Sequence, residues 1–305
     1  MLKWPNKKPK KLLITGANGM LGQNLVKEFS TDHEITGIDI GPSVFHDEAV
    51  NLIQLNLLET EALRETIITH EPEAIIHGAA YTNVDGAEKD ADAAFRVNAY
   101  VPGDLARIAN ELDIPLIHIS TDYVFSGDNG PYRESDACDP QGIYARSKYE
   151  GEETVRNIAK RSAIIRPNVL YGHGYDLKSS FVDWLIFELK EGNAVNIVTD
   201  QFSNPTYARR LAVMIRIIIA NEAWDTWHFG AKEVVSRFDF AQQVADVFGL
   251  RTELIHAIST SDLNQAAPRP MKCGLICDKI EEKLGVKILS IQEELELLKE
   301  ELHAS

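Results

Sequence analysis

The chain has little cysteine and no long apolar segment. Its 305 residues include only three cysteines, Cys138, Cys273 and Cys277, which supply neither an even disulfide framework nor the paired ligands of a zinc site. We therefore expect reduced thiols. The apolar runs are far shorter than the roughly 20 residues that cross a bilayer, and the basic start MLKWPNKKPKK lacks the apolar part of a signal peptide. These features predict a cytoplasmic protein without a membrane role.

Positive charge is also scarce relative to negative charge. The sequence contains 31 Lys and Arg against 46 Asp and Glu, a formal net charge of -15. Such a field repels nucleic-acid backbones and anionic lipid surfaces, so neither is an expected partner. The hydrophobic share of 44% and the charged share of 25% are typical of a folded globular protein. The length predicts one large domain or two of ordinary size.

Strand-like and helix-like segments alternate through the first half of the chain. Apolar strand patterns occupy 11–15, 34–40, 52–55, 74–77, 115–120 and 162–166, and helical patterns occupy 21–29, 61–69, 91–112 and 144–159. This order predicts an α/β fold, a doubly wound parallel sheet of the Rossmann type. In such a sheet, ligands bind at the carboxyl ends of the strands.

Beyond Pro167 the alternation weakens, and a smaller mixed lobe is predicted to follow. We expect a dinucleotide-binding domain over 1–167 and a substrate-binding lobe over 168–305, with about 206–235 returning to the first domain. At the end of the chain, apolar residues recur four, three and four positions apart, as on one face of a helix: Ile291, Leu295, Leu298 and Leu302. We expect this helix to pack on its own domain, with a subunit interface as the alternative.

A glycine-rich turn, GANGMLG at 16–22, joins the first strand to the first helix. Glycines there allow a tight turn and a close approach to a pyrophosphate held at the helix N-terminus. Asp39 ends the next strand, about 20 residues further on, where a carboxylate binds the adenosine ribose. Because it repels a 2′-phosphate, NAD(H) is favoured over NADP(H), although Lys8 and Lys10 keep NADP(H) open. A merely loop-capping Asp39 is the structural alternative.

Tyr144 and Lys148, four apart in YARSK, share one face of a predicted helix. An ammonium beside a phenol lowers the phenol pKa from about 10, which favours acid–base chemistry near neutral pH. The pair alone is common on surface helices. Here it follows STDYVF at 120–125, which closes a strand on the same edge as the glycine turn. The Thr121 hydroxyl could stabilise a developing oxyanion there, so the positions favour hydride-transfer chemistry.

Taken together, these motifs resemble the extended short-chain dehydrogenase/reductase family. HGAA at 77–80 and Asn98 in the following helix fit the same pattern. Within the family, four strings are similar to the dTDP-4-dehydrorhamnose reductases, across nearly the whole chain: YTNVDGAE at 81–88, STDYVFSGD at 120–128, YARSKYEGE at 144–152 and PTYARRLA at 205–212. Many epimerases of this fold have SSxxVYG where this chain has STDYVFSG.

This resemblance implies an NAD(P)H-dependent oxidoreductase that reduces the 4-keto group of a nucleotide-linked 6-deoxyhexulose, and it suggests a homodimer. Hydride would pass from the nicotinamide to the sugar C4, and Tyr144 would protonate the resulting alkoxide. Lys148 would tune Tyr144 and hold the cofactor ribose, while Thr121 would polarise the ketone.

Two sets of binding residues follow from the same resemblance. Contacts with the dinucleotide are expected from Gly16, Asn18, Gly19, Met20, Leu21, Gly22, Asp39, Ile40, Asn56, Leu57, Ala79, Ala80, Tyr81, Asn98, Tyr144, Lys148 and Arg166. Contacts with the nucleotide sugar are expected from Thr82, Val84, Thr121, Asp122, Tyr123, Asn168 and Arg269. The Arg269 guanidinium could pair bidentately with a diphosphate, or it could be a structural surface arginine.

Two departures from the family pattern limit what the resemblance implies. Some bacterial members have an acidic residue two positions after the third glycine that helps to bind Mg²⁺, and this chain has Asn24, so no metal site is predicted. Asn83 and Gly86 lie in a substrate loop that varies between members, so the sugar and the nucleotide stay open. Two alternative functions remain: an NDP-sugar epimerase or another ketosugar reductase, and a non-catalytic regulatory subunit like that of methionine adenosyltransferase.

Overall fold

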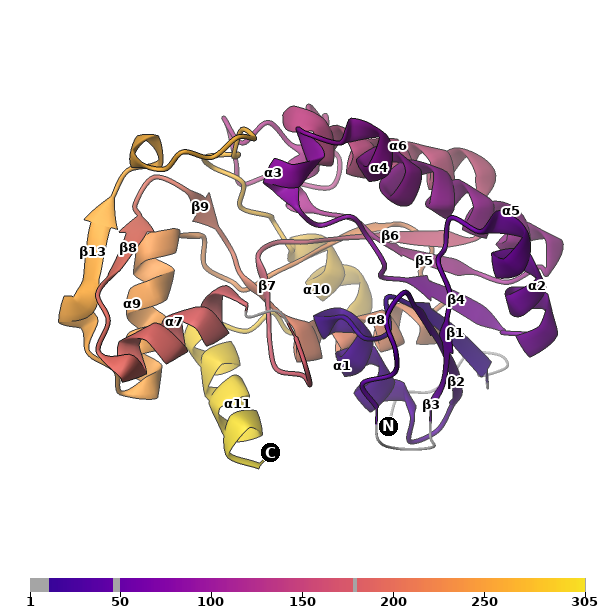
Figure 1. Cartoon of the computed structure of the whole chain (residues 1–305), viewed down its shortest axis with the longest axis horizontal. Coiled ribbons are helices and arrows are strands. Elements are labelled where there is room, and N and C mark those ends of the chain that lie inside the picture. Colours follow the sequence, from indigo (N-terminus) through magenta and orange to yellow (C-terminus); the bar gives the residue numbers. More distant parts are fainter. Residues whose placement is uncertain (1–10, 46–49, 178–179, 305) are drawn as a thin grey trace.

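One seven-stranded sheet forms the larger part of the molecule (Figure 1). The computed structural model describes residues 11–45, 50–177 and 180–304. The sheet order is β11-β6-β5-β4-β1-β2-β3, and every neighbouring pair is parallel. Its strands are β1 (Lys11–Thr15), β2 (Glu34–Asp39), β3 (Val50–Gln54), β4 (Ala74–His77), β5 (Leu116–Ile119), β6 (Ser162–Pro167) and β11 (Thr226–Phe229). The predicted doubly wound fold is confirmed.

Helices cover both faces of this sheet (Figure 1). They are α1 (Met20–Phe29), α2 (Thr60–His70), α3 (Val84–Ala87), α4 (Ala91–Phe95), α5 (Val101–Glu111), α6 (Gly142–Ile158), α8 (Ala208–Ala220) and α10 (Asp278–Leu284). Successive strand residues point to opposite faces, so Leu12 and Ile14 pack with α1 and α8, whereas Leu13 packs with α2, α5 and α6. The buried pattern of β1 therefore serves two separate apolar layers.

The predicted helix over 91–112 is interrupted. A π-helical turn, Arg96–Tyr100, joins α4 to α5 and contains the predicted site residue Asn98. Such turns insert an extra residue into a helix and often occur at functional sites. The apolar periodicity of the sequence could not reveal this turn, because the buried residues on either side keep their helical spacing.

The smaller lobe lies beside the carboxyl ends of the strands and contains three two-stranded sheets (Figure 1). Its elements are β7 (Leu170–Tyr171), α7 (Phe181–Glu191), β8 (Val195–Val198), β9 (Phe202–Ser203), β10 (Thr206–Tyr207), β12 (Val235–Ser236), α9 (Arg237–Phe248), β13 (Ile255–Ile258) and α11 (Ile291–Ala304). Between these segments the chain returns to the main sheet, with α8 against α1 and β11 beside β6. The predicted division into domains at residues 167 and 168 stays a prediction.

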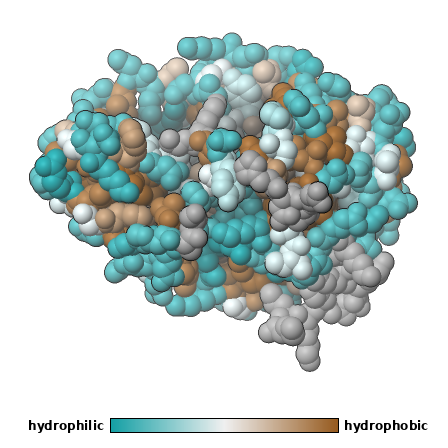
Figure 2. All heavy atoms as spheres, turned by 60° about the horizontal axis from the view of Figure 1, so that its bottom comes forward, coloured by the Kyte–Doolittle hydropathy of each residue, from teal (hydrophilic) through white to brown (hydrophobic). Residues whose placement is uncertain are grey.

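The surface and the lengths of the helices can be compared with the predictions made from the sequence. The face shown in Figure 2 is mainly hydrophilic, with hydrophobic side chains in several separate patches. Within the described ranges, no helix is both long and apolar enough to cross a bilayer.

The closing helix α11 packs on its own chain. Ile291, Leu295 and Leu298 are fully buried in the core of the smaller lobe, and Leu302 lies against it. Glu294 is buried on the same helix, where its Oε2 accepts hydrogen bonds from the Tyr171 hydroxyl at 3.1 Å and the Tyr207 N–H at 3.3 Å. Burial raises the pKa of this carboxyl to about 7. An ionised Glu294 therefore destabilises the fold at neutral pH.

We expect Glu294→Gln to raise the free energy of unfolding above pH 7 by about 1–3 kcal/mol. The folded state binds this proton more tightly than the unfolded chain does, so this residue's contribution to stability falls as pH rises from about 4.5 to about 7. The amide keeps an acceptor for Tyr171 and Tyr207 but has no such titration. Urea unfolding at several pH values measures the effect, with the exposed Glu296→Gln as control. A loss of stability that is equal at every pH would contradict this account.

Candidate active site

The glycine turn presses its backbone against the end of β4. Gly16 has a φ of +71°, and a Cβ on it would lie 2.7 Å from the Ala79 N atom. A Cβ on Gly22 would lie 2.1 Å from the Gly16 carbonyl oxygen. Glycine is therefore required at both positions. Helix α1 starts just after Gly19, which cannot cap it with a side chain, and its first turn carries no acidic residue. This N-terminus has the character of an anion-binding site.

Asp39 stands at the rim of this turn. Its Oδ2 accepts a hydrogen bond from the Asn18 N–H at 3.0 Å, and its Oδ1 accepts one from the Gly41 N–H at 3.2 Å. The carboxylate thus caps the loop, as the alternative reading of Asp39 predicts. It also lies where the ribose of a dinucleotide is expected. Ile40 beside it is 70% exposed, which leaves an apolar side chain free at the rim. Lys8 and Lys10 lie outside the described residues.

Asn98 connects the end of β4 with the helix that carries the predicted tyrosine. Its Oδ1 accepts from the Tyr81 N–H at 2.8 Å, and its Nδ2 donates to the Tyr81 carbonyl at 3.1 Å and to Ser147 Oγ at 2.9 Å. Ser147 belongs to α6 and donates in turn to the Tyr144 carbonyl at 2.8 Å. The backbone around Ala80 and Tyr81 is therefore positioned relative to α6. Asn56 and Leu57 follow β3, where Asn56 Oδ1 accepts from the Leu58 N–H.

The structure brings Tyr144 and Thr121 together. Burial raises the pKa of Tyr144 well above its usual value, and a hydrogen bond with Thr121 offsets this only in part. The ring of Tyr123 packs edge-on against that of Tyr144, with 5.8 Å between centroids. Tyr144 is therefore a protonated phenol at neutral pH, which is the form that a proton donor needs.

The predicted effect of Lys148 on the phenol is wrong for this structure. Lys148 Nζ donates to the Ile119 carbonyl at 2.6 Å, and burial lowers the lysine pKa to about 8. Desolvation of the phenol outweighs any help from the ammonium, so the pKa of Tyr144 rises instead of falling. The spacing of the two residues predicts that they share one face of α6, but it does not predict where the Lys148 Nζ atom points.

Asp122 adds a second buried acid to this wall. Burial raises its pKa to about 7, while its Oδ1 accepts from Thr121 Oγ1 at 3.1 Å. The Tyr123 N–H donates to the same threonine oxygen at 3.2 Å. The half-buried guanidinium of Arg237 attracts Asp122 electrostatically, and the Cys273 thiol donates to the Asp122 carbonyl oxygen at 3.0 Å. Thr121, Asp122 and Tyr123 therefore form one polar wall beside Tyr144.

The other predicted substrate residues fall into two groups. Thr82 is exposed and Val84 half-buried at the start of α3, where Asp85 forms an ion pair with Arg269 at 2.7 Å. Asn168 instead is buried at the junction of the lobes. Its Nδ2 donates to the Cys273 carbonyl at 2.7 Å, and its N–H donates to Thr206 Oγ1 at 3.0 Å. These contacts fix the position of Asn168, and its role in substrate binding stays a prediction.

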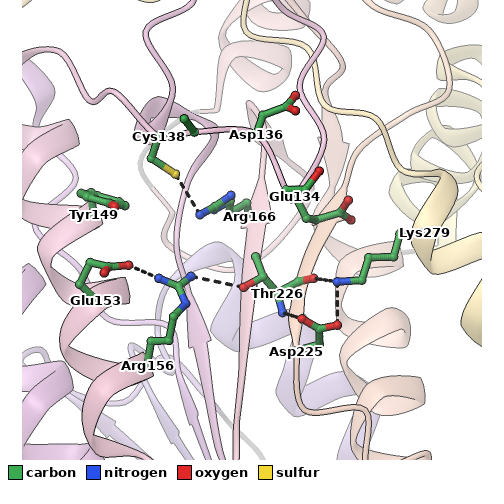
Figure 3. Close-up of a pocket in the computed structure, with 12 residues that line it drawn as sticks. Glu134, Asp136, Cys138, Tyr149, Glu153, Arg156, Arg166, Asp225, Thr226 and Lys279 are labelled. Atoms are coloured by element: carbon green, nitrogen blue, oxygen red, sulfur yellow. Dashed lines mark hydrogen bonds and ion pairs between the residues drawn. The ribbon is translucent and has the colours of Figure 1, made fainter.

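Arg166 departs from its predicted role beside the nicotinamide. Its Nε and Nη2 donate to the two carboxylate oxygens of Glu152 at 2.8 and 2.6 Å, and Nη2 also donates to Cys138 Sγ at 3.2 Å. Figure 3 shows this guanidinium in a pocket beside α6 that Tyr149 also lines. Both members of the ion pair are buried. The Arg166 side chain therefore attaches α6 to β6 through Glu152. The contact of Arg166 with the cofactor stays a prediction, and in this structure its guanidinium binds Glu152 instead.

Comparison with known proteins adds the family. Residues 10–303 match the family described as RmlD substrate binding domain. The chain belongs to this family.

The relatives of this chain include proteins named as reductases and a subunit of methionine adenosyltransferase. The probable low-salt glycan biosynthesis reductase Agl14 of Haloferax volcanii is 32% identical over 293 residues, covering 93% of this chain and 96% of that protein. The methionine adenosyltransferase 2 subunit beta of Bos taurus is 32% identical over 283 residues, covering 91% and 83%. The crystal structure of dTDP-4-dehydrorhamnose reductase from Bacillus anthracis in complex with NADP superposes with a TM-score of 0.88 at 30% identity, covering 96% and 100%.

Sequence reasoning missed four residues of this RmlD family site. Arg237, at the start of α9, and Cys273 lie near Asp122, and Asp85 and Glu88 accept hydrogen bonds from Arg269 and from the start of α6. Arg237 and Cys273 carry no motif signal, since each reaches the site from more than 100 residues away in the chain. Asp85 and Glu88 lie inside YTNVDGAE, so that string did mark their loop as part of the site.

Proposed function

We propose that this protein reduces the 4-keto group of a nucleotide-linked 6-deoxyhexulose with NAD(P)H, in the manner of a dTDP-4-dehydrorhamnose reductase. The main support is the convergence of Tyr144, Thr121 and the glycine turn at one edge of the sheet in a member of this family. The Bacillus anthracis structure, a dTDP-4-dehydrorhamnose reductase in complex with NADP, supports both the substrate class and the cofactor class.

The residues at the glycine turn fit a nicotinamide dinucleotide. Gly16 and Gly22 leave room for the pyrophosphate beside the uncapped start of α1, and Asp39 at the rim of the turn would bind the ribose. When bound, the reduced nicotinamide supplies the hydride that the sugar C4 receives. Met20 and Leu21 would offer backbone N–H groups, and Ala79, Ala80 and Tyr81 would line the opposite side.

In the proposed mechanism, Tyr144 donates its phenolic proton to the C4 oxygen as negative charge develops there. Its raised pKa keeps that proton in place until the oxygen becomes a strong base. Thr121 hydrogen-bonds the same oxygen and orients the carbonyl. Lys148, with a pKa of about 8, holds the cofactor ribose and carries a proton that can return to Tyr144. Asp122 and Tyr123 contact the sugar.

We also propose that Asp39 makes the protein prefer NADH. Asp39→Ala should weaken NADH binding more than NADPH binding, because only NADH presents both ribose hydroxyls to the carboxylate. Fluorescence titration with each cofactor measures the two dissociation constants. Exposed Asp32→Ala, at the far end of α1, is the matched control and should change neither constant. Equal losses of NADH and NADPH affinity would leave Asp39 with only its loop-capping role.

The nucleotide diphosphate is proposed to bind Arg269. This anionic protein needs a local cation for such a group, and Arg269 is held beside the predicted substrate loop. A cytoplasmic location and a homodimer complete the proposal, and light scattering of the purified chain measures the oligomeric state.

A regulatory subunit is the second candidate, favoured by the 32% identity to the methionine adenosyltransferase 2 subunit beta. Retention of Thr121, Tyr144 and Lys148 in one site argues for catalysis. A screen of dTDP-, UDP-, GDP- and CDP-4-ketosugars for loss of NADH and NADPH absorbance, with products resolved by NMR, tests the main proposal. Turnover without net oxidation would support an epimerase, and no turnover together with stoichiometric capture of a synthetase would support the regulatory function.

A further inference from the structure

The loop around α3 carries two carboxylates that bind different parts of the proposed site. Asp85 Oδ1 accepts from the Ala267 N–H at 2.9 Å, and its Oδ2 accepts from Arg269 Nη2 at 2.7 Å. Glu88 Oε1 accepts from the Ile143 N–H at 2.7 Å, directly before Tyr144 in the chain. One short loop is therefore attached both to the arginine and to the backbone beside the tyrosine.

Arg269 is held at two points. Besides its bond to Asp85, its Nη1 donates to the Ala267 carbonyl at 3.0 Å. The Arg269 side chain is 11% exposed, whereas that of Asp85 is 42% exposed. The guanidinium is thus fixed in direction from one side while its remaining N–H groups are left for another acceptor. A fixed guanidinium loses less conformational entropy when it binds a phosphate.

Glu88 acts at the first turn of α6. Gly142 has a φ of +80°, and a Cβ on it would lie 2.8 Å from Glu88 Oε1 and 3.1 Å from Pro268 Cδ. The loop around α3, the start of α6 and the segment before Arg269 therefore pack around this one glycine. A carboxylate at a helix N-terminus is stabilising, so Glu88 supports the turn that carries Tyr144. In Figure 1, α3 lies where the main sheet faces the smaller lobe.

We propose that Asp85 and Glu88 are positioning residues that fix the separation between Arg269 and Tyr144, so that substrates carrying both a diphosphate and a distant keto group are selected. This inference rests on the proposed function, in which Arg269 binds the diphosphate and Tyr144 protonates the C4 oxygen. Asp85 acts through Arg269, and Glu88 acts through the first turn of α6. A displacement of about 1 Å between reacting groups can reduce turnover by about 100-fold.

The test compares variants of the full chain on the nucleotide 4-ketosugar that the unmodified protein reduces and on the matching ketosugar 1-phosphate. Asp85→Asn should raise KM for the nucleotide sugar about tenfold with kcat changed less than about threefold, because only the charged pair with Arg269 is lost. Glu88→Ala should lower kcat about tenfold at nearly constant KM, and Glu88→Gln, which keeps the acceptor, should restore it. Both losses should be smaller on the 1-phosphate, which lacks the second anchor.

A double-mutant comparison shows whether Asp85 works through Arg269. Arg269→Gln should raise KM, and adding Asp85→Asn should raise it no further, since partners in one interaction are not additive. Asp92→Asn, an exposed carboxylate of α4 paired with Arg96, is the matched control. Thermal unfolding of each variant separates loss of fold from loss of position. An unchanged or lower KM in Asp85→Asn, or additive effects with Arg269→Gln, would overturn the positioning role.

Calorimetry with thymidine diphosphate keeps this inference separate from the proposed function. If the unmodified protein reduces no ketosugar, the proposed function fails, whatever the variants do. Weaker thymidine diphosphate binding in Asp85→Asn, with no further loss when Arg269→Gln is added, would still support the positioning of Arg269. Equal binding by the unmodified protein and by both variants would overturn it even if ketosugars are reduced.

Discussion

Tyr144→Phe should reduce turnover by about two orders of magnitude or more, as expected when a positioned acid is lost. The phenyl ring keeps the edge-on contact with Tyr123, so the wall of the site should stay in place. Affinity for NADH and NADPH should be nearly unchanged, because the proposed contacts with the dinucleotide come mainly from the glycine turn and the strand ends. Steady-state kinetics and fluorescence titration measure the two effects separately.

Tyr149→Phe is the matched control for this experiment. Tyr149 lies on the same helix but lines the separate pocket shown in Figure 3. Tyr149→Phe removes one phenolic hydroxyl from α6, as Tyr144→Phe does, but it keeps the proposed acid. Turnover should therefore stay within about twofold. Unchanged turnover in Tyr144→Phe would remove Tyr144 from the mechanism. Equal losses in both variants would point to a disturbed helix instead.

The second large effect concerns stability. Glu152→Ala should lower the free energy of unfolding by about 3–5 kcal/mol, because it leaves the guanidinium of Arg166 buried and unpaired. Glu152 is fully buried one helical turn after Lys148, so α6 should also lose its attachment to β6. Urea unfolding followed by tryptophan fluorescence measures the loss.

Two further variants distinguish an unpaired buried charge from a simple loss of packing. Glu153→Ala removes a neighbouring carboxylate whose ion pair with Arg156 is exposed, and it should lower stability by less than about 1 kcal/mol. Glu152→Leu/Arg166→Met replaces both charges with apolar groups and should recover most of the loss. If the double variant is as unstable as Glu152→Ala, the penalty does not arise from the uncompensated arginine.

The sheet and the location of the site could be predicted from the sequence for a physical reason. Apolar strand patterns alternating with helical ones admit few arrangements other than a parallel sheet, and parallel strands end at one edge. The residues after β1 and β5 must therefore lie close together, which is why Gly16 and Thr121 could be assigned to one site. Local spacing likewise placed Tyr144 and Lys148 on one helix face.

The contacts that the sequence could not predict are those made by the ends of side chains. Arg166 lies close to its expected backbone position, yet its guanidinium binds Glu152, 14 residues earlier in the chain. Lys148 shares a face with Tyr144, but its ammonium reaches the backbone of β5. The buried imidazoles of His77 and His118 stack with 5.4 Å between their centroids because β4 and β5 pair in that register. A single sequence carries no direct record of such contacts.

The position of β11 has a consequence for shortened forms of the protein. Its residues Thr226–Phe229 hydrogen-bond along β6, although about 60 residues separate the two strands in the chain. A fragment ending at Pro167 would leave the β6 edge unpaired, and open edges of this kind promote aggregation. This fragment should therefore be insoluble when it is expressed alone. Its solubility should rise when a peptide spanning 206–235 is supplied in trans.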